Sequence, residues 1–262
     1  MKITHIRNAT LLLEFQSEGH DIGLLIDPML APQATPPSLK YFGVQRRRNP
    51  LVGLPGNTAE LLSRTSHCLI THCQRGHFDH LDGAGKQFLR NSGIPAICMP
   101  RDDAYLSARG IVSRPLSGNQ TQPFFHGHIT PIPCTHGRGF IGSLMEHGHG
   151  YFIDLPGEPS VYIAGDTLLT EPVRRCLIQR QPQVSILPGG GARFDLGAKI
   201  LMDGEDVLEA SLLTSGIIVV NHLQALDHCP TTRAKLNAAA ASAGVMERLH
   251  VPADGESLDF QR

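Results

Sequence analysis

The sequence lacks long apolar runs, an excess of either charge, and tryptophan. Its longest apolar stretches, such as residues 216–220, fall far short of the ~18 residues that a membrane-spanning segment needs, so we expect no membrane partner. The 23 Lys and Arg residues balance 24 Asp and Glu residues and give a net charge of −1, without the basic excess typical of nucleic-acid-binding proteins. Charged residues make up 18% and hydrophobic residues 41% of the chain, which is not the composition of a disordered protein.

The six cysteines show no spacing typical of a disulfide framework. They lie at positions 68, 73, 98, 134, 176 and 229, and a chain of 262 residues can bury a core without disulfides. The first residues enter an alternating pattern at once and do not form the apolar segment of a secretory signal. We therefore expect reduced thiols in a cytoplasmic protein that folds as a single domain over residues 1–262.

Short β-type runs alternate with amphipathic helical runs along the chain. The pattern predicts strands at residues 3–15, 22–26, 68–71, 96–99, 128–133, 151–154, 161–164, 184–187, 217–220 and 249–251. It predicts helices at residues 58–65, 83–91, 102–109, 171–180, 205–214 and 232–243. Because the strands cluster in pairs in the first and middle thirds, two mixed β-sheets flanked by helices, an α+β class, fit better than one doubly wound parallel sheet.

Residues 28–56 contain several prolines and the triplet Arg46, Arg47 and Arg48 without a clear period. They predict a long loop, and loops of this length are usually functional or disordered. The arginine triplet is more typical of a solvated turn than of a binding site. The loop is a candidate for a lid or for a contact between copies in a homo-oligomer.

A dense group of metal-ligand residue types follows the apolar strand that ends near Ile70. Within residues 70–82 the chain carries the side chains of His72, His77, Asp79 and His80. Imidazole nitrogens and carboxylate oxygens are the ligands that Zn²⁺ and similar cations take in proteins. The tight spacing of His77, Asp79 and His80 allows the ligands to be divided between two neighbouring ions. Packing alone does not favour this composition, so we expect a metal site here.

Three later strands also end in a residue of ligand type. They are followed by His136, Asp166 and His222, respectively. Functional groups often lie where strands pass into loops, which makes the recurrence informative. Each residue also has a structural interpretation. His136 could be a turn residue, Asp166 a helix cap and His222 a buried hydrogen-bonded imidazole.

These motifs together resemble the metallo-β-lactamase superfamily, and within it the branch similar to ascorbate-6-phosphate lactonase. The resemblance extends from Ile3 to Glu256. The opening residues 2–10 and the sequence Leu25-Ile26-Asp27-Pro28 look like that branch's first hairpin and its Ile-Asp-Pro turn. The superfamily's His-x-His-x-Asp-His motif matches His77, Asp79 and His80, with His72 as the displaced first histidine, and the later ligands match in order.

The resemblance implies a four-layer αββα sandwich that holds two divalent metal ions, with Zn expected and Mn or Fe as alternatives. It implies that one ion is bound by His72, His77 and His136, and the other by Asp79, His80 and His222. Asp166 would bridge the two ions. A metal-bound water would be the nucleophile, with Asp79 handling its proton and His80 beside it, so that these two are the expected catalytic residues.

The chain departs from the superfamily's pattern in two places. Its motif reads His-x4-His-x-Asp-His, so that either His72 serves as the first ligand or, without an insertion, Arg75 occupies that place and cannot ligate. Near the N-terminus, relatives commonly have Gly-His-Ala-Thr where this chain has Arg7-Asn8-Ala9-Thr10. Asn8 could form a hydrogen bond in place of that histidine.

Several further residues are candidates for contacts around the site. His228 is a rival ligand to His222, which we prefer because it directly follows a strand, and His228 and Asp227 are then candidates for substrate contacts or for partners of the ligands. The pair His147 and His149 is more typical of a turn. Residues 189–191 are a glycine run that could bring backbone amides, with Arg193, to an anionic group, or could be a flexible turn.

Three functions remain open from the sequence. The first is a metal-dependent hydrolase that cleaves a small-molecule lactone, ester or phosphorylated metabolite. The second is an iron-dependent redox enzyme on the same fold, and the third is a protein in which the metal only holds strand ends together. Nuclease activity ranks lower, because the nuclease relatives carry an inserted domain for which the chain has no room and no basic surface is evident.

Overall fold

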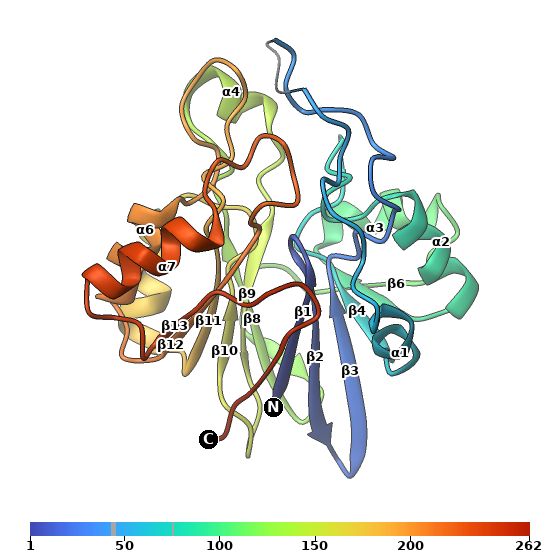
Figure 1. The fold of residues 1–262 in the computed structure, drawn as a ribbon. Helices are drawn as coiled ribbons and strands as arrows, with labels where there is room; N and C mark the ends of the chain where they lie inside the picture. Colours follow the sequence, from blue (N-terminus) through green and yellow to red (C-terminus); the bar gives the residue numbers. More distant parts are fainter. Residues whose placement is uncertain (43–45, 75) are drawn as a thin grey trace.

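The computed structural model describes residues 1–42, 46–74 and 76–262 and consists of two β-sheets packed face to face between layers of helices. Figure 1 shows α1 to α3 outside one sheet and α6 and α7 outside the other. The first sheet contains seven strands within the described residues, in the order β14, β1 (Lys2–Arg7), β2 (Thr10–Ser17), β3 (His20–Ile26), β4 (His67–Leu69), β5 (Ala96–Cys98) and β6 (Ser113–Pro115), with β14 at Ser257–Asp259. The helices that cover it are α1 (Thr58–Ser63), α2 (Gly83–Ser92) and α3 (Pro100–Ser107).

The second sheet also has seven strands in the part of the chain that is described. Their order is β13 (Leu249–His250), β12 (Ile217–Asn221), β11 (Val184–Pro188), β10 (Val161–Ile163), β9 (His149–Asp154), β8 (Gly127–Pro133) and β7 (Gln122–Phe124). Its helices are α4 (Gly139–Leu144), α5 (Glu171–Arg175), which continues as the π-helical turn η1 (Cys176–Arg180), α6 (Gly204–Ser211) and α7 (Arg233–Ser242). This α+β sandwich of two mixed sheets is the fold class that the sequence predicts.

The sheets are apolar on both faces, which explains why their strands read as nearly continuous hydrophobic runs. In β2, Leu11 and Leu13 point into the core between the sheets, where they join residues such as Ile153 and Val219. Leu12 between them points outward and packs with Leu61 of α1. Each sheet pairs antiparallel hairpins with a parallel portion, β3 to β6 in one and β10 to β13 in the other. The carboxyl ends of the parallel strands therefore meet at one edge of the sandwich.

The predicted strand at residues 3–15 is in fact two strands. A turn at Asn8 and Ala9 separates β1 from β2, and Asn8 adopts a left-handed φ of 56°, a conformation that asparagine tolerates better than most residues. The predicted helix at residues 171–180 changes to a π-helical turn after Arg175. Helix α4 and the three-residue strands β6, β7 and β14 were not predicted, because such short elements carry no periodic signal.

The described parts of the predicted loop at residues 28–56 are fixed to both halves of the molecule. The buried guanidinium of Arg7 donates hydrogen bonds to the carbonyls of Met29, Ala31 and Val52. From the other half, Asp227 accepts hydrogen bonds from the Leu39 amide and the Asn49 side chain. The triplet Arg46 to Arg48 is exposed, as expected of a solvated turn. None of the helices in the described ranges is long and apolar enough to cross a membrane.

Candidate metal centre

Histidine and aspartate side chains converge where the carboxyl ends of strands from both sheets meet. They come from the segment after β4, from the loop that leads to α2, and from the positions after β8, β10 and β12. All of the predicted ligands are buried, and among the described residues they fall into two groups. The first group is His72, His77 and His136, and the second is Asp79, His80, Asp166 and His222; in each group one ligand atom per residue lies within 4.8 Å of the others.

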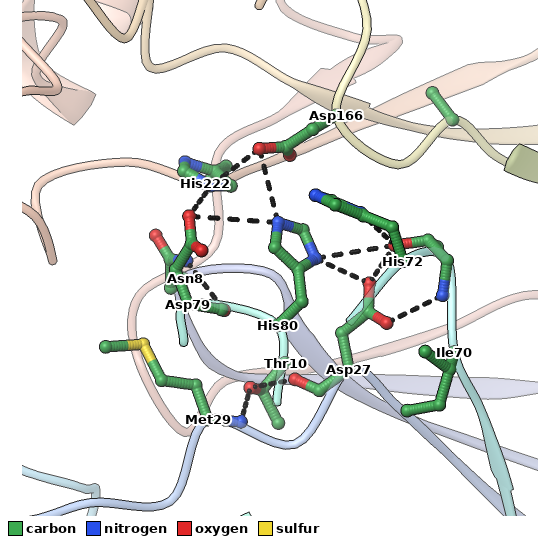
Figure 2. A network of polar contacts seen from close by, with 12 residues as sticks. Asn8, Thr10, Asp27, Met29, Ile70, His72, Asp79, His80, Asp166 and His222 are labelled. Carbon is green, nitrogen blue, oxygen red and sulfur yellow. Dashed lines mark hydrogen bonds and ion pairs between the residues drawn. The ribbon is translucent and has the colours of Figure 1, made fainter. Parts of the chain in front are cut away.

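The Asp166 carboxylate lies between the two groups. Its Oδ2 atom is 3.2 Å from His80 Nε2 and 3.3 Å from His222 Nε2, both in the second group. The same oxygen is 3.8 Å from His136 Nε2, which belongs to the first group. In Figure 2 the carboxylates of Asp166 and Asp79 both face the imidazoles of His80 and His222. One oxygen atom therefore faces imidazole nitrogens of both groups, as the bridging role predicted for Asp166 requires.

The second nitrogen of four of the imidazoles is tied to the protein, which turns Nε2 toward the centre. His80 Nδ1 donates to Asp27 Oδ2 at 2.8 Å, and His136 Nδ1 donates to the Ile200 carbonyl at 2.9 Å. His72 Nδ1 lies 3.1 Å from Thr71 Oγ1, which itself donates to Asp27. His222 Nδ1 contacts Cys229 Sγ at 3.6 Å. The ring orientations thus follow from hydrogen bonds outside the cluster.

The buried ligand atoms have no hydrogen bond to the rest of the protein within the described structure. His72 Nε2, His80 Nε2, His222 Nε2 and Asp166 Oδ2 are all buried without one, and Asp166 Oδ2 faces His80 Nε2 and His222 Nε2 at ion-pair distances of 3.2 and 3.3 Å. Buried polar atoms are almost always paired, because an unpaired one costs free energy. Imidazole nitrogens and carboxylate oxygens that face one another without hydrogen bonds to the rest of the protein form a donor set that fits one or two divalent cations such as Zn²⁺.

Electrostatics separates the two groups of histidines. Burial lowers the pKa of His77 to about 4 and lowers the pKa of His72 and His136, so these imidazoles are neutral, the form that binds a metal. In the second group, burial opposes the charge of His80, but Asp166, Asp27 and Asp79 outweigh it and raise the pKa of His80. The pKa of Asp79 is lowered, because His80 and His222 outweigh the effect of burial.

Two acidic side chains hold Gln74, which lies within the lengthened motif. The Gln74 backbone amide donates to Glu146 Oε2 at 2.8 Å, and the Gln74 side chain donates to Asp102 Oδ1 at 2.8 Å. With this loop anchored, His72 lies beside His77, with ring centroids 4.5 Å apart. His72 is therefore within the first group in spite of the insertion, and Arg75, the alternative reading, lies outside the described residues.

Asn8 lies beside the second group, where relatives commonly have histidine. The Asn8 side-chain amide donates to the Asp79 backbone carbonyl at 3.2 Å. The Asn8 backbone carbonyl accepts a hydrogen bond from the His222 backbone amide at 2.9 Å. Both Asn8 and His222 have a left-handed backbone, with φ of 56° in each. Asn8 thus ties the β1–β2 turn to two candidate ligands, which is the hydrogen-bonding role expected from the sequence.

His222, rather than its rival His228, lies in the second group. His228 is buried but outside both groups, its Nδ1 atom has no partner in the described structure, and its ring stacks on Phe194. Asp227 holds Leu39 and Asn49 of the long loop. His147 Nδ1 accepts a hydrogen bond from the His136 backbone amide at 3.0 Å and so supports a candidate ligand, while His149 begins strand β9 and does not lie in the predicted turn.

The glycine run at residues 189–191 serves close packing instead of presenting free amides. The Gly189 and Gly191 amides donate to the carbonyls of Asn221 and Met202. A Cβ atom at Gly190 would lie 2.2 Å from the His222 carbonyl oxygen, so only glycine fits beside this ligand. The Arg193 side chain is exposed. The expectation of an anion site built on these amides is therefore wrong for Gly189 and Gly191.

Asp27 and Glu146 support the cluster but were not predicted as site residues. Asp27 was visible only as part of the Ile-Asp-Pro turn, and it reaches His80, 53 positions later in the chain. Glu146 reaches Gln74, 72 positions away. Neither position has a local pattern, so these roles follow only from the folded structure.

Comparison with known proteins identifies the family. No family model matches the chain. The isothiocyanate hydrolase from Delia radicum gut bacteria is 32% identical, with all of both chains covered and a TM-score of 0.85. The UPF0173 protein YddR of Bacillus subtilis is 29% identical over 99% of this chain and 100% of its own length. A UPF0173 metal-dependent hydrolase of Azorhizobium caulinodans is 28% identical over 75% of this chain and 76% of its own length.

The chain belongs to the UPF0173 family of metal-dependent hydrolases. The metallo-β-lactamase fold protein YhfI of Bacillus subtilis superposes with a TM-score of 0.63 over 98% of both chains at 12% identity, and this likeness concerns the fold alone. The fold of the structure is thus the one that the resemblance of the motifs implies. The histidine and aspartate cluster at the edge of the sandwich is the candidate active site.

Proposed function

We propose that the chain is a hydrolase that uses two divalent cations, with Zn²⁺ the best fit to the donor set, to cleave a small molecule at an electrophilic centre. One cation would be held by His72, His77 and His136, and the other by Asp79, His80 and His222. Asp166 would contact both cations. The observation that carries the proposal is the single Asp166 oxygen that faces imidazole nitrogens of both groups at 3.2 to 3.8 Å.

When bound, the cations lower the pKa of water toward neutrality and polarise the oxygen of the reacting group. The protein's own residues supply the rest of the chemistry. Asp79 turns Oδ2 toward His222 Nε2 at 3.4 Å, which leaves Oδ1 to take up the proton of the attacking water. Because the pKa of Asp79 is lowered, its carboxylate is ionised at neutral pH, the form that both a proton acceptor and a metal ligand require. Asp27 fixes His80 so that its Nε2 atom faces Asp166.

A lactone, an ester or an isothiocyanate offers an electrophilic carbon to such a site. The likeness to the isothiocyanate hydrolase supports the last class, in which water adds to the central carbon and the products are an amine and carbonyl sulfide. The resemblance to the ascorbate-6-phosphate lactonase-like branch supports the first. A phosphorylated metabolite is a further candidate, since the same cations would polarise a phosphoryl oxygen.

Elemental analysis of the purified full-length protein tests the proposal, with His72→Ala and Asp79→Ala as variants and Asp154→Asn, an exposed residue of β9, as the control. We expect about two zinc or manganese ions per chain, fewer in both variants, and an unchanged content in the control. We also expect Asp79→Ala to lower kcat by about 10²- to 10⁴-fold on whichever lactone, ester or isothiocyanate is turned over. Iron would favour the redox alternative, and a protein that contains no metal would contradict the mechanism.

A further inference from the structure

Two aromatic side chains pack against an apolar cluster next to the candidate metal centre and have no role in holding a metal. Phe78 stands in the chain between the candidate ligands His77 and Asp79, and Phe194 follows β11. Both are partly buried and pack against one apolar cluster that includes Ile200 and Cys229. The Ile200 carbonyl holds His136 and the Cys229 sulfur contacts His222. The cluster therefore forms an apolar boundary of the site next to both groups of ligands.

His228 connects Phe194 with the second group of ligands. Its ring lies almost parallel to the Phe194 ring, with centroids 6.1 Å apart and an interplanar angle of 20°. The histidine is only 3% exposed, and its Nδ1 atom has no partner within the described structure. Burial lowers the pKa of His228 to about 4, with Asp79 and His222 among the charged groups that act on it. A neutral, buried and unpaired imidazole next to a metal centre is available to a ligand.

Tyr41 of the long loop completes an aromatic surface on the outer side of Phe194. The two rings are 6.5 Å apart, and the Tyr41 side chain is 63% exposed. The backbone amides of Tyr41 and Phe42 both donate to the Asp195 carboxylate, next to Phe194 in the chain. These hydrogen bonds hold the loop against the β11–α6 connection. Tyr41 thus extends the apolar surface from the buried His228 outward to solvent.

We infer that Phe194, which lies against His228 and Tyr41 and shares an apolar cluster with Phe78, is the subsite for an apolar, preferably aromatic, group of the substrate. The inference rests on the proposed hydrolase function and narrows its substrate class. Aromatic rings bind other rings by offset or edge contacts and gain from the apolar area removed from water. A phosphate placed against these rings would lose water, and the rings carry no charge to pair with it. An ester, lactone or isothiocyanate with an aryl or benzyl group fits the subsite better than a phosphorylated metabolite does.

Two hydroxamates test the subsite without requiring turnover. Acetohydroxamate and phenylacetohydroxamate chelate zinc through the same group and differ by one phenyl ring, so that the ratio of their dissociation constants measures the ring's contribution. Titration calorimetry would be carried out on the zinc-loaded full-length protein, on Phe194→Ala and on Phe194→Tyr. Phe140→Ala is the matched control, because it removes a phenyl group that is 80% exposed on α4.

We expect the wild-type protein and Phe140→Ala to bind the phenyl compound about tenfold or more tightly than the methyl compound. In Phe194→Ala the ratio should fall to near one, and Phe194→Tyr should retain most of the preference. Equal binding of both compounds by the wild-type protein would overturn the inference and leave the metal proposal intact. Failure of both to bind would contradict the metal centre and the subsite together. A dimer that Phe194→Ala dissociates, with an unchanged ratio, would assign the surface to a second copy.

Discussion

Asp27 shows how a single residue can fix the orientation of a buried imidazole. Its carboxylate accepts hydrogen bonds from His80 Nδ1 at 2.8 Å, from the Thr71 amide at 2.8 Å and from the Thr71 hydroxyl at 2.6 Å. Asp27 is 1% exposed and adopts a left-handed φ of 44° immediately before Pro28. Figure 2 shows it opposite the ring edge by which His80 faces Asp166. Its removal would take a carboxylate acceptor from three buried donors, which is costly in a protein interior.

We expect Asp27→Asn to weaken metal binding about 10- to 100-fold. Asparagine tolerates the left-handed backbone, but it removes the charge and replaces one accepting oxygen with a donor. Competition with a chromophoric chelator measures the affinity, and the exposed Asp154→Asn serves as the control. An affinity equal to that of the wild-type protein would show that Asp27 does not orient the ligand.

At the residue scale, the sequence predicted the composition of the cluster better than its supports. The structure brings His72, His136, Asp166 and His222 together with the central motif, because each of them lies within three residues of the end of a strand and the strand ends meet at one edge. Their roles as metal ligands stay predictions until the metal content is measured. Asp27 could not be assigned its role from the sequence, since its partner His80 is distant in the chain and a lone aspartate before proline is typical of turns.

The loop between β4 and α2 is the element in which this chain departs from the superfamily's motif. Its additional residues are attached by Gln74 to the buried Glu146, which precedes β9, and to Asp102 of α3. Arg101 of α3 also forms an ion pair with Glu146 at 3.3 Å. These contacts join three elements around the loop and explain how His72 and His77 remain neighbours with four residues between them.

We expect Glu146→Ala to weaken metal binding to the group of His72, His77 and His136 and to destabilise the protein by about 1–3 kcal/mol, because the partly buried Gln74 amide loses its acceptor. Glu146→Gln keeps an accepting oxygen and should retain most of the affinity. Zinc titration of both variants, with urea unfolding of the same samples, provides the comparison. An equal loss of affinity in the two variants would mean that the charge, and not the hydrogen bond, is what matters.

Helices and strands were predictable where the residues that start and stop them lie next to the element in the sequence. Helix α7 begins after the Thr232 cap, whose side chain accepts from the Lys235 amide, and it ends before Gly244, as the sequence indicates. Strand β14 was not predictable, because its three residues are ordered by pairing with β1 at the other end of the chain. The break between β1 and β2 was also missed, since the apolar alternation continues across the turn.

The fold brings buried histidine and aspartate side chains of opposite charge together at one edge of the two sheets. Without metal, the raised pKa values of His80 and His222 and the lowered pKa values of Asp79 and Asp166 describe an internal ion-pair network. Protons on the two histidines then occupy the place that cations would take. Both sheets must be assembled for this arrangement, because His80 belongs to the first half of the chain and Asp166 and His222 to the second.

The stabilisation by metal should therefore increase with pH. A raised histidine pKa stabilises the metal-free protein below the unfolded value of about 6.5, and this stability is lost as pH rises through the folded value. Metal must displace the same protons, so it binds more weakly at low pH. His77 and His228, with pKa values of about 4, are neutral with or without metal above that pH and do not reverse the trend.

We expect the difference in Tm between zinc-loaded and metal-free protein to be larger at about pH 8 than at about pH 6. Calorimetry of both forms in buffers that do not bind zinc measures the difference. Replacing His222 by alanine removes one raised imidazole and should flatten the pH dependence, whereas replacing the exposed His20 should leave it unchanged. A difference in Tm that is constant or falls toward pH 8 would contradict the exchange of protons for metal, because protons displaced from raised imidazoles can only weaken binding in acid.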